Sequence, residues 1–333
     1  MKNKILALLA TIGMVSSVSA VEINDNISIN GFIDGSWSSV DTDSTTNPAD
    51  ERAMGVDEVE LNFIVTAGSV SGEIHLDNNW NDRTQGDDGN GIEQAHFTYS
   101  FENGLSAQIG RFGTAAGLER EDPAGLYTYS RSYNDARFDL GNIDNNVYRF
   151  DGVRLAYASD QFSLSVAAFN PTDAVEETNF AGGSEDDLDY EIAVAFNGLE
   201  NLDLAIGLHQ RNTSQPTGGA VVDDITLLNV TAGYTFNNVL LLGEYIKYDE
   251  DNNADLSAYT LIADYDFNDK VGIAVRYSEY EDVTLGIQDD INKLTFAPNY
   301  AITESLGTIL EYSSTDDGNN DEDMLAIELT YTF

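Results

Sequence analysis

Hydrophobic and polar positions alternate over the last eleven residues of the chain, 323–333 (DMLAIELTYTF). Apolar side chains occupy every second position, at Leu325, Ile327, Leu329, Tyr331 and Phe333. Small or polar side chains fill most of the positions between them. A period of two predicts a β-strand with one apolar face and one mostly polar face.

The same alternation recurs along the chain and predicts sixteen strands. We expect them near residues 27–34, 58–66, 70–77, 95–101, 105–109, 147–158, 162–170, 188–197, 202–211, 225–236, 239–248, 256–267, 270–280, 291–300, 306–314 and 323–333. Turns of two or three residues alternate with longer polar stretches, at residues 38–55, 78–91, 171–187, 212–224 and 315–322. This layout predicts an all-β fold: a transmembrane antiparallel β-barrel of about 16 strands, with short periplasmic turns and long extracellular loops.

A soluble β-sandwich or β-solenoid would show the same alternation within each strand. Two features favour a membrane barrel instead. The outward parity of most strands would expose a continuous apolar surface, which soluble monomers rarely tolerate. Aromatic side chains also lie at or near strand ends, where interfacial girdles form. They are Trp37, Trp80, Phe101, Tyr157, Phe196, Phe236, Phe267, Tyr300 and Phe333.

The N-terminal segment predicts export. Lys2 and Lys4 precede an apolar run from residue 5 to 15, and a small-x-small sequence ends at Ala20. This pattern is typical of a secretory signal peptide over residues 1–20, because the apolar run is too short for a helical membrane anchor. Residues 21–333 then form a single barrel domain.

Composition and charge narrow the function. The 333 residues include no cysteine, which removes thiol catalysis and thiolate metal sites. The signal segment holds two of the 15 basic residues and none of the 58 acidic ones, so the mature chain carries a formal charge of −45. Such a chain cannot neutralise phosphates, so nucleic acid is excluded as a partner. Its self-repulsion calls for screening by salt or divalent cations.

The chain resembles the Gram-negative outer-membrane porins. The resemblance rests on the signal segment, the opening strand NISINGFIDGSW, a long third outer loop and the terminal strand that ends in Phe333. It implies an outer-membrane barrel that assembles as a homotrimer, with a third loop folded into the pore. It also implies contact with outer-membrane lipids, lipopolysaccharide and the assembly machinery, for which Phe333 would be the C-terminal signal. The PEFGGD sequence of enterobacterial general porins is absent from the third loop.

The inward parity of the strands carries most of the charged side chains. Carboxylates predominate, which predicts a lumen that attracts cations and repels anions. Taken singly, most of these residues are equally compatible with a solvated wall. The expected lumen-facing residues are Asp34, Glu58, Glu60, Glu73, Asp77, Asp189, Glu191, Asp203, Arg211, Asp264, Asp266, Lys270, Arg276 and Glu328.

The third loop, residues 113–146, has a different charge balance. The segment 111–154 holds six arginines and seven acids, which makes it nearly neutral in a very acidic chain. Arginine forks could pair with wall carboxylates and dock the loop inside the barrel, where nearby tyrosines would help to shape a constriction. An ordinary external loop remains the alternative. The candidate constriction residues are Arg111, Glu119, Arg120, Glu121, Asp122, Arg131, Arg137 and Arg154.

Two segments bring together the ligand types that calcium prefers, residues 77–90 (DNNWNDRTQGDDGN) and 316–323 (DDGNNDED). Their spacing matches no calcium-loop pattern, so we expect solvated acidic loops that bind divalent cations loosely at most. No cofactor and no defined metal site is expected.

An outer-membrane lipid hydrolase is the enzymatic alternative. The three histidines, His75, His96 and His209, all fall on inward parity, and no serine stands beside one in a recognisable motif. We therefore expect no enzyme but a porin for passive diffusion of small hydrophilic solutes, with a preference for cations. A channel specific for a sugar or peptide and a non-conducting structural or adhesive barrel remain as alternatives.

Overall fold

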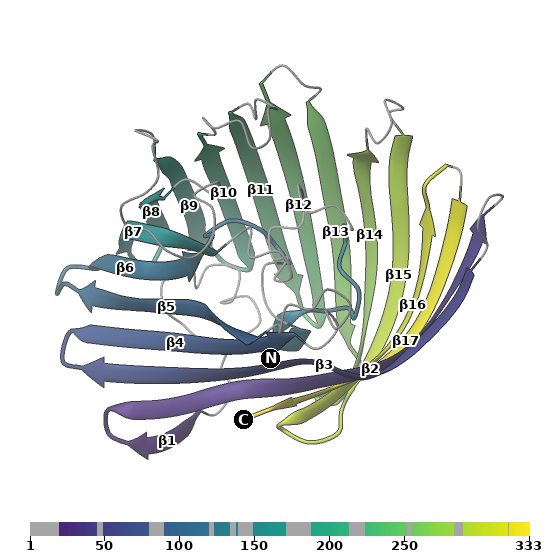
Figure 1. The fold of residues 1–333 in the computed structure, drawn as a ribbon, viewed down its shortest axis with the longest axis horizontal. Helices are drawn as coiled ribbons and strands as arrows, with labels where there is room; N and C mark the ends of the chain where they lie inside the picture. The colour runs from purple at the N-terminus through teal and green to yellow at the C-terminus, as the bar shows by residue number, and fades with distance from the viewer. Residues whose placement is uncertain are drawn as a thin grey trace.

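Sixteen long strands form a closed antiparallel ring in the computed structural model of the chain (Figure 1). The structure describes residues 20–44, 49–79, 90–119, 123–133, 138, 149–170, 188–212, 224–251, 255–282, 289–318 and 320–333. An additional short strand, β1 (Val21–Asn24), pairs with the start of β2.

The strands of the ring follow each other in chain order. They are β2 (Ile27–Ser44), β3 (Ala49–Ala67), β4 (Val70–Asn79), β5 (Asn90–Ser100), β6 (Leu105–Gly113), β7 (Arg149–Ala158), β8 (Phe162–Phe169), β9 (Asp189–Leu199), β10 (Leu202–Arg211), β11 (Ile225–Phe236), β12 (Val239–Glu250), β13 (Leu256–Asp266), β14 (Val271–Asp282), β15 (Asp289–Ala301), β16 (Leu306–Asp316) and β17 (Asn320–Thr332). Each pairs with its sequence neighbours, and β17 closes the ring on β2.

The closing ladder runs to the last residue of the chain. It joins β17 to β2 from Asn320 opposite Ser44 to Thr332 opposite Phe32. Beyond it, Phe333 and Gly31 exchange two backbone hydrogen bonds, each of 3.0 Å. A Cβ at Gly31 would lie 2.1 Å from the carbonyl oxygen of Glu60 on β3 and 3.1 Å from the ring of Phe333, so glycine is required at this position of β2. The ring therefore leaves no open strand edge at the junction of its two ends.

The two faces of the wall differ in chemistry as the alternation predicts. On β17 the apolar residues are 42% to 47% exposed on the outer face, at Leu325, Ile327, Leu329 and Tyr331. Ala326 and Glu328 between them are buried on the inner face. Aromatic side chains are exposed beside the short turns at Phe101, Phe236, Phe267 and Tyr300. This apolar exterior, with a polar interior, is the arrangement of a barrel that lies in lipid.

The sixteen expected strands and the barrel class are confirmed, but two expected loops are wrong. Residues 38–55 are largely strand, because β2 extends to Ser44 and β3 begins at Ala49. Residues 315–322 contract to a tight turn between β16 and β17, in which Asp316 and Asp317 accept backbone N–H groups of the turn. Trp37 lies within β2, while Trp80 and the expected signal segment up to residue 19 lie outside the described residues.

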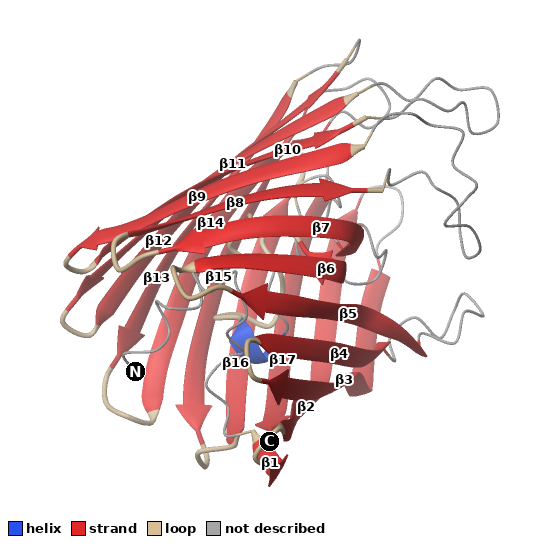
Figure 2. Cartoon of the chain, turned by 90° about the vertical axis from the view of Figure 1, so that its left-hand side faces the viewer, coloured by secondary structure: helices blue, strands red, loops and turns tan. Residues whose placement is uncertain are grey.

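Figure 2 shows the wall from the side, with the single described helical turn inside it. This turn is the 3-10 helix Pro123–Gly125 of the third loop. Within the described ranges, no helix has the length and hydropathy needed to cross a membrane.

Deletion of Phe333 tests the closing ladder. Loss of the two hydrogen bonds to Gly31 should lower the free energy of unfolding by about 1–3 kcal/mol, since each bond contributes roughly 0.5–1.5 kcal/mol. Phe333→Ala is the matched control, because it retains both backbone bonds. Urea unfolding of the refolded barrel, followed by circular dichroism, measures the difference. Equal stability of the two variants would contradict the role of the backbone bonds.

Candidate functional site

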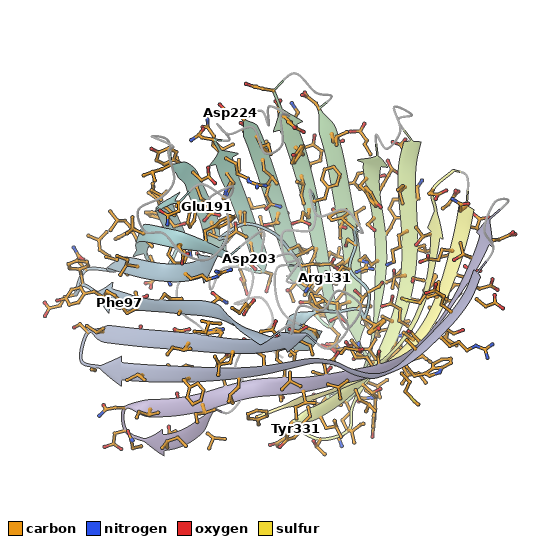
Figure 3. All side chains as sticks on the ribbon, in the orientation of Figure 1. Phe97, Arg131, Glu191, Asp203, Asp224 and Tyr331 are labelled. Atoms are coloured by element: carbon orange, nitrogen blue, oxygen red, sulfur yellow. The ribbon has the colours of Figure 1, made fainter. Side chains whose placement is uncertain are left out.

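The third loop lies inside the barrel, against its inner wall. Figure 3 shows Arg131 of this loop within the ring of strands. Described loop residues make hydrogen bonds to side chains of β9, β11, β12, β14, β15, β16 and β2. The loop therefore runs across the inner face of the wall and then turns back along that face.

Glu191 of β9 holds the start of the loop. Its carboxylate accepts the backbone N–H of Ala115 at 3.1 Å and the hydroxyl of Thr114. Arg154 of β7 donates to the same carboxylate at 3.0 Å and to the carbonyl of Gly113 at 2.7 Å. The Arg154 guanidinium also lies 4.5 Å above the ring of Phe112. The Arg154 guanidinium and the Glu191 carboxylate are both buried, so the charge of each compensates the charge of the other.

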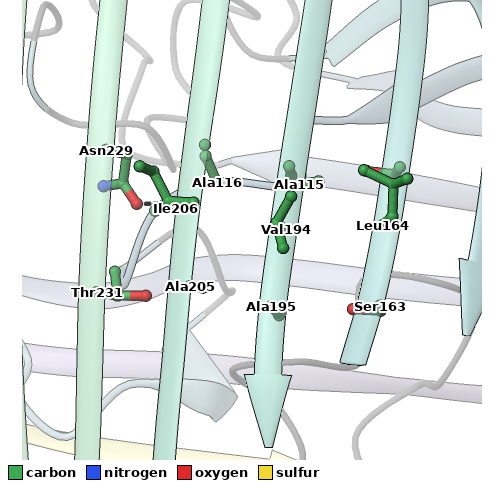
Figure 4. A pocket seen from close by; sticks show the side chains of 14 residues that line it. Ala115, Ala116, Ser163, Leu164, Val194, Ala195, Ala205, Ile206, Asn229 and Thr231 are labelled. Carbon is green, nitrogen blue, oxygen red and sulfur yellow. Dashed lines mark hydrogen bonds between the residues drawn. The ribbon is translucent and has the colours of Figure 1, made fainter. Parts of the chain in front are cut away.

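Small side chains of the wall make room for the loop at this point. Gly207 of β10 faces Ala116, and a Cβ at Gly207 would lie 2.5 Å from the Cβ of Ala116. Figure 4 shows the small cavity that remains, of about 20 Å³, between residues 115–117 and strands β8 to β11. This volume is enough for about one water molecule. The loop thus packs directly onto the wall.

Asn229 of β11 and Glu244 of β12 hold the next turn of the loop. Asn229 Oδ1 accepts the N–H of Gly117 at 3.3 Å, and Glu244 Oε1 accepts the N–H of Leu118 at 2.6 Å. Asn229 Nδ2 also donates to Glu244 at 2.8 Å. Wall carboxylates therefore bind backbone N–H groups of the loop. These hydrogen bonds require no arginine in the loop.

Arg276 of β14 is the central anchor of the loop, and its side chain is fully buried. It forms an ion pair of 2.7 Å with Glu119. The four N–H groups of its two terminal nitrogens are shared among six acceptors at 2.6–3.2 Å: Glu119, Thr128, Ser130 (hydroxyl and carbonyl), Arg131 and Thr295. Five of these acceptors are loop atoms, so one wall guanidinium fixes both passes of the loop.

The returning part of the loop is held by three further wall residues. Glu311 of β16 accepts the N–H of Ser130 at 3.1 Å. Lys293 of β15 donates to the carbonyl of Arg131 at 3.1 Å, and Ser278 of β14 donates to the carbonyl of Ser132 at 2.9 Å. The hydroxyls of Tyr129 and Ser36 of β2 lie 3.0 Å apart, which extends the contact to the far wall.

Apolar side chains fill the lumen between the loop and strands β6 to β14. They lie at the strand ends from which the longer connections start. Loop residues Tyr133 and Phe138 pack on Tyr280 and Tyr248 with ring centroids 5.9–6.5 Å apart. The same cluster contains Phe112, Ala116, Phe150, Ala167, Phe169, Ile225, Leu227, Ile246, Leu256 and Ala258. Deeper in the barrel, Leu118 and Tyr127 pack on Leu240, Leu242 and Ile262. One side of the lumen is therefore a packed core.

Nearly buried carboxylates gather on the inner face of the wall, away from the apolar cluster. Six inner-face acids on five neighbouring strands, β17 and β2 to β5, form what we term the acidic arc: Glu328, Asp34, Glu58, Glu60, Asp77 and Glu93. Asp34 stands directly opposite Glu58 in the ladder, and Glu60 opposite Asp77. Arg131 of the loop interacts electrostatically with Glu58. This part of the inner face thus has carboxylates on the wall and a guanidinium on the loop beside them.

Most of the expected lumen residues lie on inner-face positions. These are Asp34, Glu58, Glu60, Glu73, Asp77, Asp189, Glu191, Asp203, Arg211, Asp264, Asp266, Arg276 and Glu328. Lys270 is different, because β14 begins at Val271 and Lys270 is exposed in the preceding turn.

Of the expected constriction residues, Glu119 and Arg131 contact each other within the loop, and Arg154 of β7 holds the start of the loop. Arg111 lies on the outward parity of β6, opposite Asp151 of β7, because Phe112 takes the inward position. Arg120, Glu121, Asp122 and Arg137 lie outside the described residues.

Several anchor residues were not singled out from the sequence, among them Asn229, Glu244, Lys293 and Glu311. All four stand on inward parity, and two of them have apolar residues on both sides: Asn229 between Leu228 and Val230, and Glu311 between Leu310 and Tyr312. Their inward parity was the sequence signal that could have identified them as residues facing the loop. The expected pairing of arginines from this segment with wall carboxylates occurs at Arg154 with Glu191 and at Arg131 with Glu58. The wall also supplies carboxylates for loop N–H groups and the central arginine, Arg276, which the sequence did not indicate as a loop anchor.

The charge state of the loop follows from its partners. Burial alone would raise the pKa of Glu119, but Arg276, the N–H of Ser132 and Arg131 outweigh burial and lower this pKa below its ordinary value. Burial raises the pKa of the Tyr127, Tyr129 and Tyr133 hydroxyls, so all three remain neutral. Glu119 is therefore a carboxylate over the physiological pH range.

Comparison with protein families agrees with this architecture. The sequence model of the family described as "Putative beta-barrel porin-2, OmpL-like" matches residues 23–333. The chain belongs to this family. It is therefore an outer-membrane porin of a Gram-negative bacterium. No curated protein sequence matches the chain.

Solved structures share the fold at low sequence identity. OprB of Pseudomonas putida aligns with a TM-score of 0.66 at 10% identity, over 92% of this chain and 94% of its own. The outer-membrane channel DcaP of Acinetobacter baumannii aligns with a TM-score of 0.65 at 13% identity, over 95% and 100%. An anion-selective porin from Comamonas acidovorans aligns with a TM-score of 0.63 at 14% identity, over 92% and 99%. Identities this low establish the barrel and leave the ion preference to the residues of the lumen.

Arg276→Met tests the anchoring of the loop. The variant loses all the hydrogen bonds of the guanidinium and leaves the Glu119 carboxylate without its ion-pair partner, which should cost about 3–5 kcal/mol. We expect a lower free energy of unfolding and a larger, noisier single-channel conductance as the loop leaves the wall. Arg276→Lys is the control, since it keeps the charge but cannot reproduce the fork. Unchanged conductance in Arg276→Met would show that the loop does not limit the pore.

Acid pH should release the same anchor. Because folding lowers the pKa of Glu119, its contribution to loop docking is complete above pH about 4.5 and is lost as the pH falls through the lowered pKa. Single-channel conductance recorded in steps from pH 7 to about 3 should therefore change at the acid end. Glu119→Gln, which cannot ionise, should lack that change. Identical pH profiles for the two proteins would contradict the assignment.

Proposed function

We propose that the chain forms a water-filled channel for passive diffusion of small hydrophilic solutes and ions, with a preference for cations. The acidic arc is the observation that carries this proposal. Six carboxylates lie on the inner face of five neighbouring strands, five of them 1–6% exposed, and Arg131 is a loop cation that interacts with Glu58. A pore lined by carboxylates concentrates cations and repels anions.

The cationic side chains of the lumen support the same preference by their position. Arg154 and Arg276 are buried in contacts with Glu191 and Glu119, and Lys293 donates to a loop carbonyl. Their charges are used to hold the loop and contribute little to the field of the open part.

A non-conducting structural barrel is the second candidate. The observation that favours it is the apolar cluster around Tyr133 and Phe138, which fills one side of the lumen. Zero conductance in planar bilayers would support this candidate over the porin. Saturable block of the current by a sugar or a peptide would instead indicate a substrate-specific channel.

A transport role is also favoured over lipid hydrolysis by the histidines. His75, His96 and His209 lie on inner-face positions, away from the lipid-facing surface. The expected homotrimer and the contacts with lipopolysaccharide and the assembly machinery belong to this proposal. Chemical cross-linking in detergent followed by gel electrophoresis tests the trimer.

Neutralising part of the acidic arc should reduce cation preference. In the triple variant Glu58→Gln, Glu60→Gln, Asp77→Asn, the reversal potential in a planar bilayer under a KCl gradient should move toward zero. The matched control removes three carboxylates from exposed short turns, with Glu102→Gln, Asp160→Asn and Asp269→Asn. It makes the same change of net charge and should leave the reversal potential unaltered. An equal shift in both proteins would refute the acidic arc as the selective element.

A further inference from the structure

Two histidines and a carboxylate meet on the inner face of β4 and β5. Glu73 and His96 stand directly opposite each other in the ladder, and His75 follows two residues after Glu73 on the same face. The two imidazole rings are 6.3 Å apart between centroids. One donor atom from each of the three residues lies within 4.8 Å of the other two. A small inward movement would bring these atoms to the spacing of a shared ligand.

The ring of His75 is oriented by two carboxylates. Its Nδ1 lies 3.1 Å from Oε1 of Glu60, and its Nε2 lies 3.3 Å from Oε2 of Glu73. Glu60 is almost fully buried, so its carboxylate is held rigidly behind the ring. An Nδ1–H donated to a carboxylate fixes the tautomer and directs Nε2 outward as a ligand atom. With the ring proton on Nδ1, Nε2 carries the lone pair that would bind a divalent cation.

The ring of His96 is held from the side of β6. Gln108 Nε2 lies 3.2 Å from Nδ1 of His96, and an amide flip of Gln108 would let its oxygen accept an Nδ1–H instead. Gly110, directly opposite His96, has φ of +132°, and a Cβ there would lie 2.7 Å from Cα of His96. Glycine at this position allows β6 to close on His96.

An independent observation comes from Asn62 of β3, directly opposite His75 in the ladder and on the same face. Its side chain is 7% exposed, and its Oδ1 has no hydrogen-bond partner within the described residues. Buried side-chain oxygens are nearly always satisfied. A water molecule bound to a cation at His75 would supply the missing donor, since directly opposed side chains have Cβ atoms about 4.5–5.5 Å apart.

We propose that Glu73, His75 and His96 form a binding site for a divalent first-row transition-metal ion, with Zn²⁺ as the best match. Two imidazoles and one carboxylate are a ligand set that zinc prefers, and the fourth position opens toward the lumen for water. Magnesium and calcium prefer oxygen ligands alone and select against this set. The side chains of His75 and Glu73 are 13% and 11% exposed, so an ion in the lumen can reach them.

The experiment is isothermal titration of the mature protein, free of any histidine tag, with ZnCl₂ in detergent. We expect one saturable site that excess Mg²⁺ does not compete for. His75→Gln and His96→Gln should each weaken binding by at least about 100-fold, and Glu60→Gln by about 10- to 100-fold. His209→Gln is the matched control: it removes the remaining histidine of the chain, on β10, and should keep the wild-type affinity.

A second measurement needs no variant and no ion current. X-ray absorption of the zinc-loaded wild-type protein should show imidazole nitrogens at about 2.0–2.1 Å from the metal. An all-oxygen shell, binding that survives in the double variant His75→Gln, His96→Gln, or equal competition by Mg²⁺ would each overturn the site. Because both measurements detect the bound ion, their result is independent of whether the barrel conducts.

Discussion

The structure depends on the requirement that every backbone N–H and C=O of a lipid-embedded strand find a partner within the protein. A sheet meets this requirement only if its first and last strands join. Here β2 and β17 do so over the full length of β17, and the ladder continues to the exchange between Gly31 and Phe333. Closure fixes the register of the wall and thereby decides which side chains face water inside the barrel.

The closed wall in turn determines how the third loop is held. A loop inside a barrel must satisfy its own backbone groups, and side chains of the wall do this work. Glu191, Glu244 and Glu311 accept loop N–H groups, while Arg276 and Lys293 donate to loop carbonyls. Much of the charge that looks like channel lining in the sequence is therefore structural. The acidic arc, which lies opposite the packed side, remains to set the field.

The barrel could be predicted from the sequence because a period of two reports a wall with unlike solvents on its two sides. Alternation does not mark a strand where water contacts both faces of the sheet. The hairpin of β2 and β3 beyond Ser38 and before Gly55 is polar on both faces, so the alternation that marks a strand disappears there although the strands continue. The docked loop was likewise out of reach in detail. Parity places Glu244 and Arg276 on the inner face, but only the path of the loop decides which atoms they contact.

The close approach of Gly207 to Ala116 has a consequence for how such a pore can change. Here the wall is thin because its inward residues are small, and the loop rests directly on the backbone of the strands. Any larger residue introduced under the loop would displace it toward the opposite wall and narrow the passage, without altering a single lining residue. The bore of this channel is thus encoded partly in positions that no permeating solute ever touches.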